Sequence, residues 1–276
     1  GYALMRDIYL GHTLTKQLSY VSIFVGITPL IAPLMGGYIV QYGNWRGCFG
    51  LLLILAVFLL FLKFRYLPET LVNKSAKAHH PSVMLKNYQS LLRNKACIGP
   101  IVIASFAFSG LLTMGSLLPF LVIKELHFNP STYGWIAGIP ALAYLSGSFL
   151  VGQFGSKFCF SHLVIFGTGL GCISMGLALF FNWHSFDLVS LLIPLFGYLF
   201  GIGCIIPRAS AEALSIVPHL TGSAAALLCA CMFGVSACMI GIGSHLNQTS
   251  PIALFSLLLF TVFCTALTLI YSQRNV

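Results

Sequence analysis

The sequence predicts an all-α fold, a polytopic bundle of membrane-spanning helices, and three observations support this. First, 58% of the 276 residues are hydrophobic and only 7% are charged, whereas about a quarter of the residues in a soluble domain are charged. Second, the chain contains about eight apolar runs of membrane-crossing length. Third, these runs lack the two-residue alternation of a membrane barrel strand and are about twice as long as one. The α-helix is then the remaining structure that can form all of its backbone hydrogen bonds internally in lipid.

The apolar runs define the expected spans and the division of the chain. The predicted spans are 18–40, 47–62, 97–121, 134–154, 159–182, 188–207, 222–246 and 252–271. A long polar stretch follows the second span, and many transporters consist of two helix bundles joined by such a loop. We therefore expect residues 1–62 to be the remainder of an N-terminal bundle, 63–95 a central loop, and 96–276 a six-helix C-terminal bundle.

The positions of the basic residues, which give the chain its net charge of +9, indicate its orientation in the membrane. The basic residues lie between the apolar runs instead of forming one basic face, which argues against a nucleic-acid partner. If the stretch 63–95 is cytoplasmic, twelve of the fourteen Lys and Arg lie on that side, and only Arg46 and Lys124 lie on the other. Because basic loops are retained in the cytoplasm, we expect the central loop and the C-terminus to be cytoplasmic.

Enzymatic and metal-dependent functions are not indicated. The sequence contains no His-Glu-x-x-His motif and no pair of acids within a span, so we expect no catalytic residue. The nine cysteines lie mostly within apolar runs, and no Cys-x-x-Cys pair occurs with a second ligand pair. We therefore expect no metal site and no cofactor, and interpret the cysteines as small packing residues.

The first span contains two prolines and several small residues that suggest a conformational role. Each proline removes a backbone donor, so the helix must bend or find partners on its neighbours. Small residues allow a second helix to approach closely. The candidate hinge or sliding contact consists of Gly26, Pro29, Ala32, Pro33, Gly36 and Gly37. A kinked helix with a packing role only is the alternative.

Two further sets of residues are candidates for function. Arg6 with Asp7, and Arg208 with Glu212, place a basic and an acidic residue at corresponding cytoplasmic helix ends of the two halves; solvated interfacial anchors are the alternative. Drug-binding cavities are mostly apolar and aromatic with a few polar groups. Residues near the middle of spans that fit this description are Phe106, Ser109, Tyr144, Phe196, Tyr198, Met232 and Phe233.

Several segments resemble the major facilitator superfamily, and within it the drug:proton antiporters of the bicyclomycin-resistance type. They are Leu-Met-Arg-Asp-Ile-Tyr at 4–9, the antiporter signature Ala-Pro-Leu-Met-Gly-Gly at 32–37, Pro-Arg-Ala at 207–209 and Val-Pro-His-Leu-Thr-Gly-Ser-Ala-Ala-Ala-Leu at 217–227. The resemblance implies a major-facilitator-type fold with an incomplete N-terminal half that lacks its first three to four spans. It places the proton-coupling carboxylate in the first span of the family.

The resemblance also implies a function. It implies proton-coupled multidrug efflux across the bacterial inner membrane by alternating access, acting on a hydrophobic or amphipathic small molecule and working as a monomer. Two alternatives remain open at this point. One is a transporter for another small solute, although a sugar or acid carrier would have polar or charged groups within its spans. The other is a truncated, inactive or partner-dependent membrane fragment.

Overall fold

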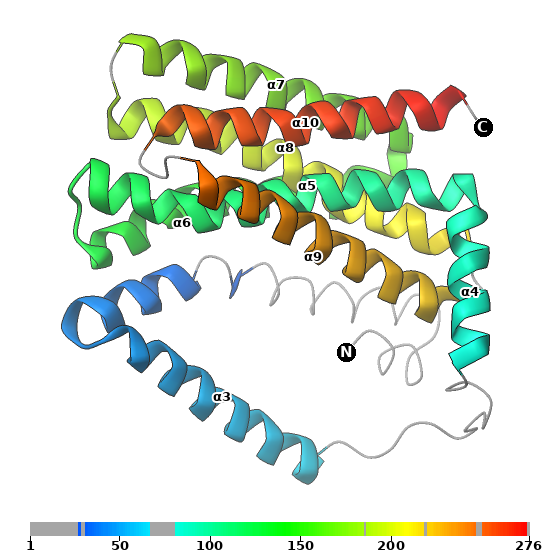
Figure 1. Ribbon diagram of the computed structural model, residues 1–276, viewed down its shortest axis with the longest axis horizontal. Coiled ribbons are helices and arrows are strands. Elements are labelled where there is room, and N and C mark those ends of the chain that lie inside the picture. Colours follow the sequence, from blue (N-terminus) through cyan, green and yellow to red (C-terminus); the bar gives the residue numbers. More distant parts are fainter. Residues whose placement is uncertain are drawn as a thin grey trace. The chain divides into compact units, whose positions relative to one another are not determined.

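The computed structural model describes residues 27–28, 31–66, 81–184, 186–217, 220–246 and 250–274, and every regular element in these residues is a helix (Figure 1). Seven of the described helices are long and apolar enough to cross a membrane. The predicted all-α membrane bundle is confirmed. Of the first predicted span, 18–40, the structure describes residues 27–28 and 31–40, and the helix of the latter continues to residue 42.

The helix bounds follow the predicted spans closely from residue 45 onward. The elements are α3 (Trp45–Tyr66), α4 (Pro81–Arg93), α5 (Lys95–Pro119), the π-helix η1 (Phe120–Glu125), α6 (Pro130–Phe154), the 3-10 turn η2 (Gly155–Lys157), α7 (Phe160–His184), α8 (Leu188–Ser215), α9 (Thr221–His245) and α10 (Pro251–Arg274).

The structure differs from the prediction in two places. The span predicted to end at Pro207 continues as α8 to Ser215, because the alanines that follow Arg208 are strong helix formers and continue the helix past the charged residues. The stretch 63–95, predicted to be a loop, includes the end of α3 and the whole of α4. α4 begins at Pro81, and proline is favoured at the first position of a helix because its missing donor is not needed there.

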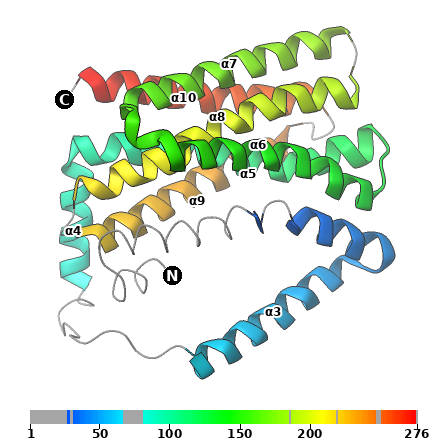
Figure 2. The same ribbon diagram turned by 180° about the vertical axis from the view of Figure 1, so that it is seen from behind.

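The chain divides into two compact units. One comprises residues 1–77 with 128–138, and the other comprises residues 78–127 with 139–276. Within the second unit, α5 packs against α8, α9 and α10, and α7 packs against α8 and α10 (Figures 1 and 2). α5 is therefore the central helix of this unit.

Small and hydroxyl-bearing residues allow α5 to be surrounded by other helices. Ser105, Ser109 and Thr113 are buried in it. The Ser105 hydroxyl donates to the Ile101 carbonyl at 2.7 Å, and the Ser109 hydroxyl donates to the Phe106 carbonyl at 2.7 Å. These bonds satisfy the two serine hydroxyls within the helix itself, so neither needs a partner from another helix. The Thr113 hydroxyl is buried and has no hydrogen-bond partner among the described residues.

Tyr198 joins three helices in the core. Its side chain is fully buried, and its hydroxyl shares a 2.8 Å hydrogen bond with the Thr261 hydroxyl of α10. The same tyrosine hydroxyl lies against Gly110 of α5, where an added Cβ would overlap it. Because a buried tyrosine hydroxyl needs a polar partner, the glycine and the threonine together fix where α8 sits against α5 and α10.

Side-chain caps define two helix starts. The Asn94 side chain accepts hydrogen bonds from the backbone of Ala96 and Cys97 at the start of α5. Asp187 and Ser190 form a reciprocal capping box at the start of α8. The bonds that Asp187 accepts from the backbone and side chain of Ser190 hold the pKa of its carboxyl below the ordinary range. Asp187 thus serves as a cap at the end of a span and carries its charge outside the membrane.

We expect Gly110→Ala to destabilise the protein, because its new methyl group would occupy the position of the Tyr198 hydroxyl. Overpacking of this kind costs about 1–3 kcal/mol. Thermal unfolding of the purified chain measures the loss. Gly115→Ala on the same helix is the matched control, since an added Cβ there has no neighbour within 4 Å. Adding Tyr198→Phe to Gly110→Ala should recover part of the loss; equal melting temperatures for both alanine variants would contradict this account.

Candidate functional site

The helix that contains the Ala-Pro-Leu-Met-Gly-Gly segment, residues 31–42 and here called the signature helix, packs closely against the first turns of α6. A Cβ added at Gly134 would lie 2.8 Å from the Leu34 Cα and 2.9 Å from the Pro33 carbonyl oxygen. A Cβ added at Gly37 would overlap the Pro130 carbonyl oxygen. Because the obstructing atoms belong to backbone, they cannot rotate away as a side chain can. The two helices therefore touch backbone to backbone, and glycine on each side is what permits this.

Two hydrogen bonds connect the same pair of segments. The Ser131 backbone N–H donates to the Gln41 side-chain oxygen at 3.0 Å, and the Trp135 indole N–H donates to the Tyr38 hydroxyl at 3.4 Å. Ser131 lies in the first turn of α6, where a backbone donor has no partner within its own helix. Gln41 supplies that partner, so the side chain fixes the start of α6 against the signature helix.

The structure brings only some of the predicted signature residues into this contact. Pro33 and Gly37 take part in it. Ala32 is exposed, and an added Cβ at Gly36 would have no neighbour within 4 Å. Gly26 and Pro29 lie outside the described residues. The sequence did not indicate Gln41, whose role depends on a partner 90 positions away.

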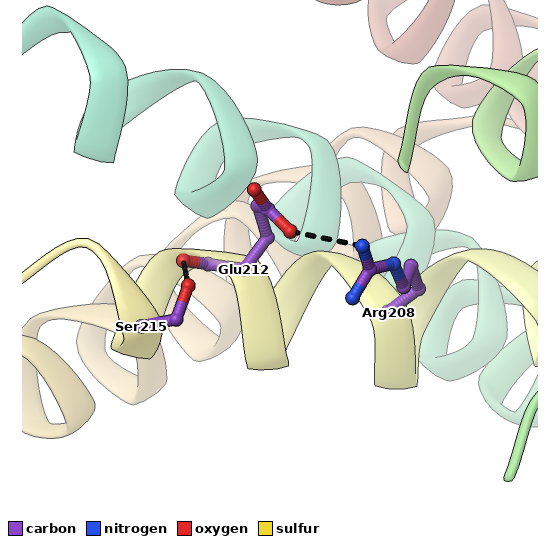
Figure 3. Close-up of polar contacts among 3 residues, drawn as sticks. All are labelled: Arg208, Glu212 and Ser215. Carbon is purple, nitrogen blue, oxygen red and sulfur yellow. Dashed lines mark hydrogen bonds and ion pairs between the residues drawn. The ribbon is translucent and has the colours of Figure 1, made fainter. Parts of the chain in front are cut away.

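The second candidate, the pair Arg208 and Glu212, lies in the last two turns of α8 (Figure 3). The guanidinium Nη2 is 3.2 Å from the Glu212 Oε2, and the two side chains are 28% and 31% exposed. The Ser215 hydroxyl donates to the Glu212 backbone carbonyl at 2.9 Å. The predicted counterpart of this pair, Arg6 and Asp7, lies outside the described residues.

The guanidinium of Arg208 is only partly satisfied. Its Nε is buried and has no hydrogen-bond partner among the described residues. A buried donor without a partner is costly, and guanidinium groups suit planar, two-pronged acceptors. The Arg208 guanidinium therefore pairs with Glu212 through Nη2 and leaves its Nε–H without an acceptor among the described residues.

The candidate substrate residues fall in different places. Phe106 is half-buried and Ser109 is buried on α5, Tyr144 is half-buried on α6, and Met232 is half-buried on α9. Phe233 of α9 is 60% exposed, and its ring packs edge-on against Phe108 of α5 at a centroid distance of 5.4 Å. The neighbouring helices α5 and α9 thus carry a shared aromatic surface. The sequence did not single out Phe108, because an aromatic residue in an apolar span gives no indication of which residue it contacts.

Tyr198 and Phe196 differ from this group. Tyr198 is enclosed in the core with Thr261, whereas Phe196 on the same helix is exposed. Beside Tyr198 is a small cavity of about 10 Å³, lined by residues that include Thr168, Thr261 and Thr265. This space suits about one water molecule and is far too small for a drug-sized ligand.

Acidic and metal-binding groups are sparse in the described part of the chain. The described ranges contain no cluster of three or more His, Cys, Asp or Glu that could hold a metal ion. Of the acids there, Glu125 ends η1, Asp187 caps α8, and Glu212 pairs with Arg208. No described acid therefore lies in the middle of a span.

Comparison with known proteins connects these features to a family. A family model described as Major Facilitator Superfamily matches residues 1–242. The chain is 28% identical over 82% of its length to an uncharacterized MFS-type transporter, YdgK, of Bacillus subtilis. It is 25% identical over 82% of its length to multidrug resistance protein D of Escherichia coli, and 26% identical over 86% to the bicyclomycin resistance protein homolog of Haemophilus influenzae. The chain spans 57%, 56% and 60% of these relatives, respectively.

We expect Gly37→Ala and Gly134→Ala each to lower the melting temperature by several degrees, because each methyl group would press on backbone atoms of the facing segment. Gly36→Ala is the matched control on the same helix, since it meets no neighbour and alanine favours a helix more than glycine does. Thermal unfolding in detergent compares the three variants. A similar effect at all three positions would mean that the close contact does not stabilise the fold.

Proposed function

Because the chain belongs to the Major Facilitator Superfamily, a family of membrane transporters and not of enzymes, we propose that it works in proton-coupled efflux. The proposed cargo is a small hydrophobic or amphipathic compound, which leaves the cell across the bacterial inner membrane by alternating access. The chain is proposed to act as part of a monomeric transporter. The spans described here are those of a multi-pass membrane protein.

The observation that carries this proposal is the backbone contact between the signature helix and α6. Alternating access requires helices that change position against each other. A contact at Gly37 and Gly134 has no interlocking side chains at its closest points, and only two hydrogen bonds join the segments beside it. Such a surface can slide or rock at low cost, whereas interdigitated leucines would resist.

The proposed substrate class follows from the exposed side chains. The α5–α9 surface presents Phe233 and Phe108, with Phe106 and Met232 nearby in sequence, and carries no charged group at this level. Such a surface suits an apolar or aromatic compound. Two of the relatives carry multidrug or bicyclomycin resistance in their names, and this supports a drug-like cargo. We propose Phe106, Tyr144, Met232 and Phe233 as contacts. Ser109 is fully buried and bonded within α5, so it is proposed to shape this surface from behind, as Tyr198 does by positioning α8.

The proposed orientation places the ends of α3, α6 and α8, and the start of α5, in the cytoplasm. Lys63, Arg65, Lys157 and Arg208 then lie on the cytoplasmic side, while Arg46 and Lys124 mark the opposite side. This arrangement satisfies the tendency of basic residues to remain in the cytoplasm. The Arg208–Glu212 pair is then proposed to act at the cytoplasmic mouth, where its unsatisfied Nε can take a partner in one conformation and lose it in the other.

Proton coupling requires a carboxylate that titrates within the membrane. None of the described acids is placed for this, so we do not assign the coupling group to the described spans. The test compares drug accumulation in efflux-deficient cells that express this chain, or the chain preceded by the residues encoded upstream of it. Each is measured with and without a proton uncoupler. Uncoupler-sensitive export by either form supports the proposal, and no export of any tested drug by both would refute it.

We expect Gly37→Leu to abolish uncoupler-sensitive export in whichever form is active, because a leucine side chain would lock or separate the signature helix and α6. Membrane abundance, measured by immunoblot, should be close to that of the parent. Gly36→Ala should export normally, since that position faces open space. Full export by a well-inserted Gly37→Leu variant would show that this contact has no part in transport.

A further inference from the structure

Helix α4 occupies an unusual place in the second unit. It ends at Arg93, and the single residue Asn94 separates it from α5, which together with η1 forms a helix of membrane-crossing length from Ala96 to Glu125. α4 contacts both α5 and α9, and it runs across the ends of these helices in both views (Figures 1 and 2). Because α5 and α9 cross the bilayer along their length, a helix that lies across their ends lies along the membrane surface.

The apolar side of α4 is wider than the surface that α5 and α9 cover. Leu91 is 1% exposed and faces the bundle. Leu85 and Leu92, seven residues apart and therefore on one face of the helix, are 59% and 56% exposed. Tyr88 is half-buried. Part of the apolar side of α4 is thus left uncovered by the bundle.

The exposed side of α4 also carries positive charge. Lys86 and Arg93 are exposed and are likewise seven residues apart, so they form a basic stripe beside the exposed leucines. No acidic residue occurs in the sequence between Glu69 and Glu125. Within the described residues neither cation forms an ion pair. Apolar and basic stripes side by side are the pattern of a helix that lies in a membrane interface rich in anionic lipid.

We propose that α4 is an interfacial helix that binds anionic phospholipid head groups through Lys86 and Arg93 while Leu85 and Leu92 enter the acyl region. Its occupant is therefore the lipid surface itself. Because only Asn94 lies between α4 and α5, lipid bound to α4 fixes the start of the central helix of the unit. This inference adds a lipid site to the proposed transporter and does not depend on the cargo or on the direction of transport.

The first experiment measures lipid binding by the full chain. The purified protein is titrated with phosphatidylglycerol or phosphatidylcholine in detergent, and bound lipids are counted by native mass spectrometry. The parent should prefer phosphatidylglycerol, and each cation removed by Lys86→Gln or Arg93→Gln should weaken that preference about 5-fold. Lys157→Gln at η2 and Lys124→Gln in η1 are controls with the same charge change. An unchanged preference in the α4 double variant would overturn the proposal.

The second experiment tests whether lipid, and not another part of the chain or a second copy, covers the exposed side of α4. Hydrogen exchange of residues 81–93 is compared for the full chain in nanodiscs of phosphatidylcholine alone and of phosphatidylcholine with phosphatidylglycerol. We expect slower exchange in the anionic nanodiscs and loss of that difference in Lys86→Gln/Arg93→Gln. Equal protection in both nanodiscs would mean that another part of the chain or a second copy covers α4, and would overturn the proposal.

Discussion

Close approach of one helix backbone to another is the constraint on which this structure depends. In lipid each helix satisfies its own backbone bonds, so helices gain little from further polar contacts and associate mainly through packing. Where a glycine stands on each side, as at Gly37 and Gly134 or at Gly167 and Gly201, the backbones come into direct contact. The same absence of side chains that allows the contact also leaves it free of interlocking groups, and this connects the packing of the signature helix to the proposed movement.

Polar contacts have two different roles around this framework. In the core, Tyr198 and Thr261 bond each other in full enclosure and set the position of α8. At the end of the same helix, Arg208 and Glu212 are partly exposed, and the arginine keeps an unused donor. A satisfied pair favours one arrangement of helices, whereas a partly satisfied pair can exchange partners at little cost. α8 therefore has a middle that is fixed in the core by Tyr198 and an end where the polar contacts of Arg208 are free to change.

The fold was largely predictable from the sequence because its main determinant is local. Apolar runs of about 20 residues must be helical in lipid whatever their neighbours are, and the helices from α5 to α10 lie where the runs predicted them. The exceptions are also local in origin. Alanines continue α8 past Pro207. Residues 81–93 form an amphipathic helix of 13 residues, which is too short to cross a membrane, so a search for long apolar runs assigns it to the polar linker.

The site was predictable only in part. The sequence by itself determined the membrane class, the spans and the signature segment, since these depend on hydropathy and on residues adjacent in the chain. Only the tertiary structure decided that Gly37 and not Gly36 meets a neighbour, that Tyr198 is enclosed by Gly110 and Thr261, and that Leu85 and Leu92 remain uncovered. The physical reason is that a helix has several faces of similar composition, and which face meets a partner depends on residues far away in the sequence.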